Sequence, residues 1–305
     1  MSTSSTVHRV GTQGQGMELL LHPGDEYLGS LEPDSLQVLA YVKLYMPDTK
    51  MVTMTASCIP MQFPKERPPF LRVRGSIVAS GAEQVITYLQ EQFAVEDTSG
   101  QDEVAAYSAL LTDRFLPAML YSKWLNSQNY IDFTRSSYAK ILYFPVTLFY
   151  LSWQHRAVGH LIMRGAPPDL TLEQRGLELM SKAEECVGLL SARLGEHDYF
   201  CGDHSSSLDI RLFGYLEQLL QSPHCEADPV SKSLRTHGNL VLFCQRMRKS
   251  LFPEIKARSS EGVSLPTMSG PTSLWRDSAL WISVGVATTV LCVQAVRVGL
   301  FQQLS

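Results

Sequence analysis

The sequence lacks the features that direct a chain into the secretory pathway or into an organelle matrix. Its first sixteen residues, MSTSSTVHRVGTQGQG, contain no apolar run of the kind that forms the core of a signal peptide. Arg9 is the only arginine before Arg67, whereas matrix presequences are rich in arginine. We therefore expect a disordered segment over residues 1–16 and a protein whose bulk faces the cytosol.

Cysteine motifs and clustered positive charge are also absent. The six cysteines show no C-x-x-C spacing, and together with the missing signal peptide this predicts free thiols in a reducing compartment. The formal net charge is −4, with basic residues scattered along the chain. Nucleic-acid binding depends on a concentrated basic surface, so the composition excludes that class of function.

A long apolar run near the C-terminus predicts a membrane anchor. Residues 279–296 contain no charged side chain, and this length is close to the minimum that crosses a hydrocarbon core roughly 30 Å thick. Gly285 and the many β-branched residues of the run are common in membrane spans and unfavourable in soluble helices. We expect a transmembrane helix over 279–300 that inserts after synthesis, preceded by a Pro/Ser/Gly-rich linker over 254–278. The alternative is a buried helix of a globular domain.

The N-terminal part of the chain alternates strand and helix patterns. A Pro-Pro pair precedes a predicted hairpin that turns at Arg74–Gly75, and Pro69 stands where a thioredoxin-like fold commonly has a cis-proline. The patterns predict a strand over 17–23, a helix over 33–46, a strand over 50–57, a two-stranded hairpin over 68–80 and a helix over 81–93. We therefore expect a thioredoxin-like α/β domain over residues 17–95.

Residues 101–253 are predicted to form an all-helical domain. Pro117 should kink the first of its helices, and Thr171 to Gln174 has the form of a capping box that begins a later one. Ser206 and Asp209 form the acidic variant of that box, in which each residue caps a backbone N–H of the other. The helix that they begin is apolar nearly all round, which predicts that it lies at the buried centre of the domain.

This combination of an α/β half and a helical half with a capped central helix resembles the glutathione-transferase fold. Within that superfamily the chain resembles the metaxin family, in many positions that occur in one order. The resemblance covers nearly the whole chain, and the anchor is similar to that of the metaxin-1 type. The matching runs are LLTDRFLPAMLYSKWLNSQNYIDFTRSSYAKILYFPVTLF (110–149) and AEECVGLLSARLGEHDYFCGDHSSSLDIRLFGYL (183–216).

The resemblance implies a subunit of the sorting and assembly machinery of the mitochondrial outer membrane. Metaxins lie on the cytosolic face of that machinery and support the import and insertion of β-barrel proteins. The implied partners are an outer-membrane β-barrel assembly subunit and a second metaxin, together with the lipid bilayer around the C-terminal helix.

Residues that could support catalysis are few. A glutathione transferase stabilises the thiolate of its cofactor with a hydroxyl or thiol near the first helix, and Tyr27 is the best candidate here. Such enzymes also hold the γ-glutamyl group with a Glu-Ser or Gln-Ser pair, which falls on Gly81–Ala82, where both side chains lack oxygen. We therefore predict no catalytic residue and no cofactor. A membrane-attached glutathione-transferase-like enzyme is the alternative function.

A zinc site is also a weak prediction. His197, Cys201 and His204 occur within eight residues, and Asp203 could supply an oxygen ligand. A structural zinc site needs four ligands, usually in tighter motifs. The segment is interpreted more simply as the turn before the capped helix, so we predict no metal.

The aromatic run from Trp124 to Trp153 is the strongest candidate for a partner surface. It contains nine aromatic residues in thirty, interrupted by Asn126, Asn129 and Pro145. Core packing accounts for about half of these rings. Since exposed aromatic patches mark contacts with partners, we expect Trp124, Asn129, Tyr130 and Phe133 to form part of an interaction surface.

Overall fold

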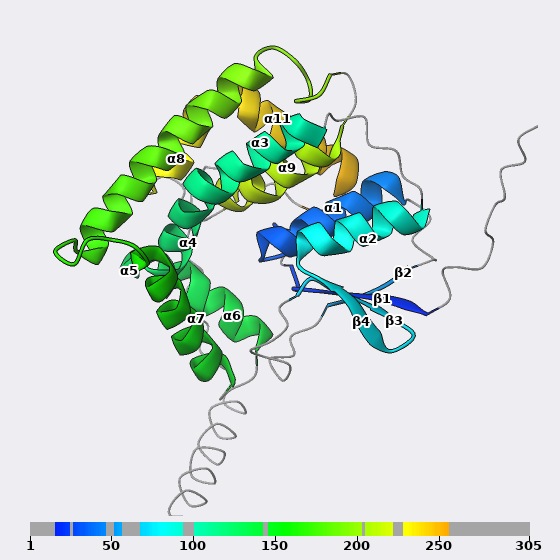
Figure 1. Ribbon diagram of the computed structural model, residues 1–305, viewed down its shortest axis with the longest axis horizontal. Coiled ribbons are helices and arrows are strands. Elements are labelled where there is room, and N and C mark those ends of the chain that lie inside the picture. The colour runs from blue at the N-terminus through cyan, green and yellow to red at the C-terminus, as the bar shows by residue number, and fades with distance from the viewer. Residues whose placement is uncertain are drawn as a thin grey trace, which may run out of the picture. The chain divides into compact units, whose positions relative to one another are not determined.

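The computed structural model describes residues 16–24, 27–46, 52–56, 68–93, 101–142, 146–202, 205–221 and 228–255 (Figure 1). The chain divides into two units, Met1–Arg258 and Ser259–Ser305, and all described residues belong to the first. No helix in this described part is long and apolar enough to span a bilayer. Residues 1–15 of the expected disordered segment, the expected anchor and all but the first two residues of the expected linker lie outside the described residues.

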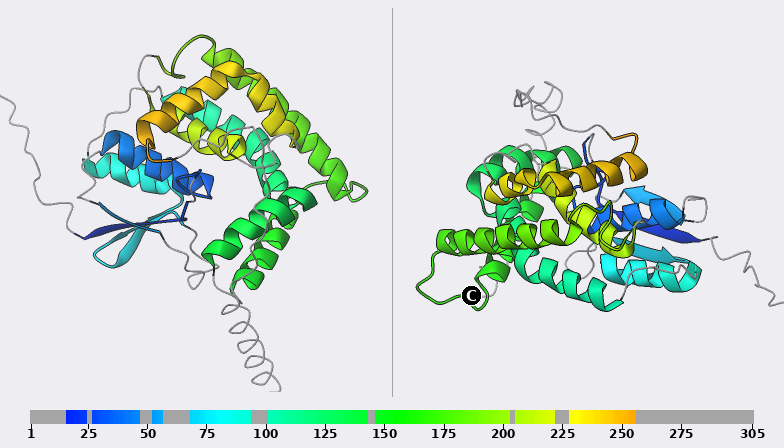
Figure 2. Two further views of the ribbon diagram at one scale, coloured as in Figure 1. Left: turned by 180° about the vertical axis from the view of Figure 1, so that it is seen from behind. Right: turned by 90° about the horizontal axis from the view of Figure 1, so that it is seen from above.

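The N-terminal half contains a four-stranded sheet. Its strands β1 (Met17–Leu21), β2 (Val52–Ala56), β3 (Phe70–Val73) and β4 (Ser76–Ser80) lie in the order β2-β1-β3-β4. β1 pairs with β2 in parallel and with β3 antiparallel. The helices α1 (Pro33–Tyr45) and α2 (Ala82–Phe93) cover one face of the sheet (Figures 1 and 2). This is the predicted thioredoxin-like order.

Local chemistry accounts for the turn between β3 and β4. Arg74 has φ = 51° and Gly75 has φ = 85°, and two consecutive positive φ angles are the mark of a type I′ hairpin turn, where glycine is favoured. The central strand β1 is buried at four of its five positions, which is why its sequence MELLL is a nearly continuous apolar run. The Pro68–Pro69 peptide bond is cis, as the position of Pro69 predicts.

The helical half begins with a long, interrupted helix. α3 (Gln101–Leu110) continues through a π-helical turn, η3 (Leu111–Phe115), into α4 (Leu116–Trp124). Pro117 has no N–H to donate to residue 113, and the wide turn directly before it accommodates this missing hydrogen bond. The predicted irregularity at Pro117 is therefore present as a change of helix type.

Short and long helices complete this half. They are α5 (Ser127–Asn129), a second π-helical turn η4 (Tyr130–Thr134), α6 (Arg135–Ile141), α7 (Val146–Met163), α8 (Leu172–Leu194), α9 (Ser207–Leu220), α10 (Pro229–Thr236) and α11 (Gly238–Leu251). Thr171 and Gln174 form the predicted capping box at the start of α8.

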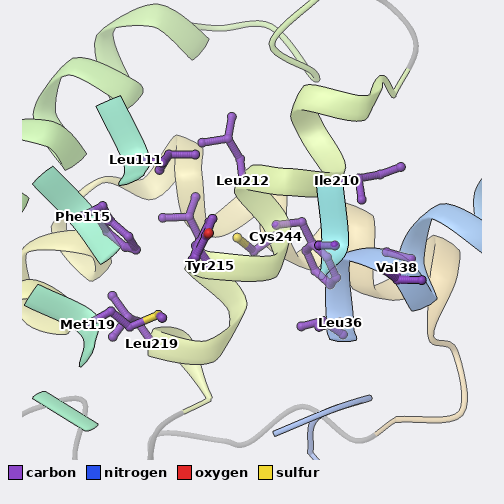
Figure 3. Packing of buried hydrophobic residues seen from close by; sticks show 14 of the residues in the cluster. Leu36, Val38, Leu111, Phe115, Met119, Ile210, Leu212, Tyr215, Leu219 and Cys244 are labelled. Carbon is purple, nitrogen blue, oxygen red and sulfur yellow. The ribbon is translucent and has the colours of Figure 1, made fainter. Parts of the chain in front are cut away.

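Helix α9 lies at the centre of the fold. In Figure 3 its Leu212, Tyr215 and Leu219 project toward Phe115 and Met119, and α1 with Leu36 and Val38 lies on the opposite side of α9. Side chains from both halves thus belong to one continuous apolar cluster. α1 and α9 approach closely because residue 214 is glycine: a Cβ there would lie 2.3 Å from Gln37 Cγ. The division into domains at 17–95 and 101–253 stays a prediction within this shared core.

Candidate functional site: the cleft between the two halves

A cleft of about 430 Å³ lies between the α/β half and the helical half. Its α/β side is formed by His22 after β1, the start of α1 and Pro68 before β3. Its helical side is formed by apolar residues of α4 and α7, together with Gln154. The lining residues are His22, Glu32, Pro33, Asp34, Pro68, Leu116, Leu120, Trp124, Gln154, Ala157, Val158 and Leu161. Because it brings polar side chains of one half against apolar side chains of the other, this cleft is the candidate site.

The polar groups of the cleft are largely bound to one another. Glu32 Oε1 accepts a hydrogen bond from Lys123 Nζ over 2.9 Å, and the hydroxyl of Tyr138 donates to the same oxygen. Lys123 Nζ also donates to the backbone carbonyl of Leu31 over 2.8 Å. Burial is the largest influence on Glu32 and favours its neutral form, but Lys123, His22 and Tyr138 together hold its pKa below the ordinary value. Glu32 is therefore a paired carboxylate rather than a free base.

Two further groups at the cleft carry shifted pKa values. Burial lowers the pKa of His22, and the nearby Lys123 adds to that effect while Glu32 opposes it. Desolvation and the nearby Glu32 raise the pKa of Asp34 to about 6, although the residue is exposed. Near neutral pH the lowered pKa keeps His22 mainly neutral, whereas Asp34 stays mostly ionised because its pKa of about 6 lies below 7.

Trp124 does not lie on a surface. Its side chain is 2% exposed and packs against the rings of Tyr138 and Tyr150, with centroid separations of 5.4 and 6.4 Å. Asn129 is also buried, and its Nδ2 donates a hydrogen bond to Ser122 Oγ over 2.9 Å. The prediction that these two residues contact a partner is therefore wrong: the asparagine serves an internal hydrogen bond and the indole fills the core. Tyr130 and Phe133 are partly exposed, and for them the prediction stands untested.

The hydrogen bond of Asn129 belongs to a chain that joins three helices. Ser122 Oγ of α4 donates to Asp228 Oδ1 over 2.6 Å. Asp228 in turn caps α10 by accepting from the backbone N–H of Ser231 over 2.9 Å. Asn126 caps α5 through its side-chain oxygen. The polar residues that interrupt the aromatic run thus have local structural partners, which the sequence pattern does not distinguish from exposure.

The transferase residues are not assembled at the cleft. Tyr27 lies in the loop after β1, is partly exposed and is not among the residues that line the cleft. Gly81 has φ = 83° and Ala82 is buried, so neither residue can hold a γ-glutamyl group through a side chain. The hydroxyl of Tyr138 is also engaged, because it donates to Glu32 of the cleft. Pro68, the residue before the cis-proline, has no N–H with which to bind a peptide backbone.

The predicted cap of α9 is present. Ser206 Oγ accepts from the backbone N–H of Asp209, and Asp209 Oδ2 accepts from the backbone N–H of Ser206 over 2.9 Å. Asp209 Oδ1 also accepts from the backbone N–H of Phe200 over 2.9 Å. Both side chains are fully buried. The carboxylate of Asp209 therefore joins the loop before α9 to the helix itself.

The residues considered for zinc are not gathered in the part of the chain that the structure describes. His197 is exposed and Cys201 is partly buried with a free thiol. Asp203 and His204 lie outside the described residues. Across the described ranges no three His, Cys, Asp or Glu side chains are placed to share a metal ion.

Sequence reasoning did not find the network of Glu32, Lys123 and Tyr138. Glu32 occupies the N-cap position of α1 but its side chain does not cap the helix. Its partners lie 91 and 106 positions away, so no local pattern could indicate them. Gln154 was also missed: its Oε1 is buried without a hydrogen-bond partner among the described residues, although its Nε2 donates to Tyr150.

Solved structures with the same fold are glutathione-transferase-like. The chain matches the beta-etherase LigF from Sphingobium sp. strain SYK-6 with a TM-score of 0.52 and 15% identity, covering 78% of this chain and 98% of that one. It matches YqjG, a glutathione transferase homologue from Escherichia coli K-12, with a TM-score of 0.50 and 12% identity, covering 79% of this chain and 77% of that one. At these identities the similarity shows the fold alone. A glutathione S-transferase C-terminal domain family also matches residues 183–247.

Sequence relatives are more specific. Residues 35–155 match a family described as outer mitochondrial membrane transport complex protein. Human metaxin-1 is 31% identical over 252 residues, which cover 80% of this chain and 53%, about half, of that protein. Zebrafish metaxin-3 is 31% identical over 250 residues, covering 79% of this chain and 77% of the relative. Since the fold, the order of its elements and these relatives agree over about four fifths of its length, the chain belongs to the metaxin family.

Proposed function

We propose that the chain is a non-enzymatic subunit of the sorting and assembly machinery in the mitochondrial outer membrane. In this role it supports the import and insertion of β-barrel proteins from the cytosolic face, held by a tail anchor over residues 279–300. The observation that carries the proposal is family membership, together with the match of residues 35–155 to an outer-membrane transport complex family. Its partners are a β-barrel assembly subunit and a second metaxin.

The chemistry of the cleft supports a binding role over catalysis. A transferase needs an activated nucleophile and a preorganised place for the charge that develops in the reaction. Here the carboxylate of Glu32 is already bound to Lys123 and Tyr138. These three groups join the start of α1 to α4 and α6, so they fix the relative position of the two halves. The cleft thereby presents a rigid scaffold for surfaces that lie elsewhere.

The exposed part of the predicted partner surface lies at η4. Ile131 is 58% exposed beside the partly exposed Tyr130 and Phe133. A large aliphatic side chain that is mostly exposed is the kind of group that a partner protein covers. Leu177 on α8 is 71% exposed and offers a matched control on another helix.

The first experiment is affinity purification of the tagged chain from mitochondria in mild detergent. We expect an outer-membrane β-barrel protein and a second metaxin to co-elute, and Ile131→Glu to reduce their recovery while Leu177→Glu does not. Thermal unfolding of both variants should remain as in wild type, because both positions are exposed. Recovery of neither partner with the wild-type chain would overturn the proposal.

A second experiment separates the adaptor from the membrane-attached transferase. The adaptor should neither bind glutathione resin nor catalyse conjugation of glutathione to an electrophile. Turnover that is lost in Tyr27→Phe would establish the enzyme instead.

Deletion of residues 279–305 tests the anchor directly. It should move the protein to the soluble fraction after carbonate extraction. A truncated protein that still pellets with membranes would mean that the segment is not the anchor or that a second attachment exists.

A further inference from the structure

One stretch of the chain contains basic residues and no acidic ones. Between Asp132 and Asp169 there is no Asp or Glu, although the whole chain contains 30 acidic residues and has a net charge of −4. The same stretch contains four Lys and Arg residues, Arg135, Lys140, Arg156 and Arg164, and all four are exposed. Within the described residues none of the four forms an ion pair with an acidic side chain. Inside this stretch no acidic side chain compensates their charge, and only the residues that bound it, Asp132 and Asp169, are acidic.

Helix α7 adds exposed apolar side chains to this charge. Phe149 is 74% exposed and Leu148 is 50% exposed. At 3.6 residues per turn, Phe149, Arg156 and His160 fall on one side of the helix. The opposite side carries Tyr150, Gln154 and Val158, all of which are buried. The outer face of α7 thus combines a large exposed ring with Arg156, and the whole helix contains no acidic residue.

Helix α8 differs from α7 in the charges that surround its exposed apolar side chains. It also exposes large apolar side chains, Leu177 and Leu189. Around them, however, the exposed charges include Glu173, Glu178, Glu184 and Glu185. Glu178 and Glu185 are paired with Arg175 and Arg114, but α8 still carries acidic side chains that α7 lacks. An anionic surface would therefore be attracted more by the face of α7 than by that of α8.

We propose that the outer face of α7, with the flanking cations of α6, rests on the anionic lipid headgroups of the membrane to which the protein is anchored. Helices that lie in a membrane interface combine Lys and Arg with Phe, Trp and Leu in this way, since the rings enter the headgroup layer while the cations pair with lipid phosphates. The inference rests on the proposed membrane attachment. Figure 1 shows α6 and α7 together in the lower part of the helical half.

Because the anchor would hold the protein at the membrane, the contact between α7 and the lipid headgroups needs only a weak affinity. Twenty-three residues, 256–278, separate the described part from the expected span. Even fully extended, a chain of that length reaches at most about 80 Å. The described part is thus held near the bilayer, and a tethered contact forms at high effective concentration without strong intrinsic affinity.

The test uses the full chain with a photoreactive phenylalanine analogue at position 149. The protein is reconstituted into vesicles of phosphatidylcholine alone or of phosphatidylcholine with phosphatidylserine, irradiated, and analysed for lipid adducts by mass spectrometry. We expect an adduct at position 149 that increases with phosphatidylserine and decreases several-fold in high salt. The same analogue at position 177 of α8 should give no lipid adduct that depends on phosphatidylserine.

Charge-reversal variants provide a second test of the lipid contact. Arg156→Glu combined with Lys140→Glu should abolish the phosphatidylserine-dependent adduct, whereas Lys182→Glu on α8 should leave it unchanged. All three positions are exposed, and thermal unfolding of each variant establishes that it is folded.

Flotation of the vesicles distinguishes the two proposals. A chain that does not float with vesicles overturns the membrane attachment and, with it, this inference. A chain that floats but gives no lipid adduct at position 149, or equal adducts at positions 149 and 177, overturns the inference alone. An adduct between two copies of the chain, or with a protein when mitochondrial outer membranes replace the vesicles, would assign the face of α7 to a protein partner instead.

Discussion

Arg248 of α11 and Glu217 of α9 form a two-pronged ion pair inside the helical half. Arg248 Nε donates to Glu217 Oε1 over 2.6 Å, and Nη2 donates to Oε2 over 2.9 Å. Glu217 is 2% exposed and Arg248 is 9% exposed. Burial raises the pKa of Glu217, and the guanidinium group of Arg248 limits the rise. The pair joins the central helix to the last described helix.

Removing one member of this pair should be costly. Arg248→Met leaves a buried carboxylate without its donor, and we expect the free energy of unfolding to fall by about 3 kcal/mol. The double variant Glu217→Gln/Arg248→Met should recover part of that loss, because no buried charge remains. Chemical denaturation in mild detergent measures both. Equal losses in the single and the double variant would show that packing, and not charge, dominates.

The cap of α9 predicts an order of effects. Ser206→Ala removes one capping acceptor and should cost about 1 kcal/mol. Asp209→Ala also deprives the backbone N–H groups of Ser206 and Phe200 of their acceptor and should cost about 2–4 kcal/mol. Thr171→Ala, in the exposed capping box of α8, is the control and should cost at most about 1 kcal/mol. A larger effect at Thr171 than at Asp209 would contradict the central role of α9.

The contact between the two halves can be tested through two glycines. Gly214→Ala would place a methyl group 2.3 Å from Gln37 Cγ, and the resulting overpacking should cost about 1–3 kcal/mol. Gly188→Ala in α8 meets no atom within 4 Å and should stabilise the protein by up to about 1 kcal/mol, because alanine favours helix. Thermal unfolding of the two variants should therefore shift in opposite directions. A stabilising Gly214→Ala would mean that α1 and α9 are not in close contact.

Asp34 predicts a pH-dependent stability. Its pKa in the folded protein is about 6, compared with the ordinary value of 3.8. The folded state therefore holds a proton more tightly than the unfolded state, so the contribution of Asp34 to stability grows as the pH falls from about 6 toward 3.8 and is lost as the pH rises. Asp34→Asn should remove this contribution.

The measurement compares wild type with Asp34→Asn across that pH range. Their difference isolates Asp34, because burial also raises the pKa values of Asp209 and Glu217 in both proteins. We expect the asparagine variant to be the more stable of the two above pH 6 and the difference to shrink as the pH falls. Parallel curves would exclude a raised pKa at Asp34.

The sequence by itself determines the elements whose signals are local. The turn at Arg74–Gly75 follows from Gly75, which tolerates a positive φ. The starts of α8 and α9 follow from side chains that bond backbone groups three residues away. The burial of α9 follows from apolar residues on nearly all of its sides. These features require only neighbours in the chain, so patterns of spacing predict them, and the resemblance to the metaxin family adds the fold that they build.

Tertiary structure alone decides which polar and aromatic side chains meet. Trp124 and Asn129 have the sequence pattern of a surface loop, yet Tyr138, Tyr150 and Ser122 enclose them. Glu32 accepts hydrogen bonds from Lys123 and Tyr138, which lie 91 and 106 residues farther along the chain. The physical reason is the same in both cases: the environment of a side chain depends on elements that pack against it from distant parts of the chain. Local periodicity reports which face of a helix is apolar but not which element covers that face.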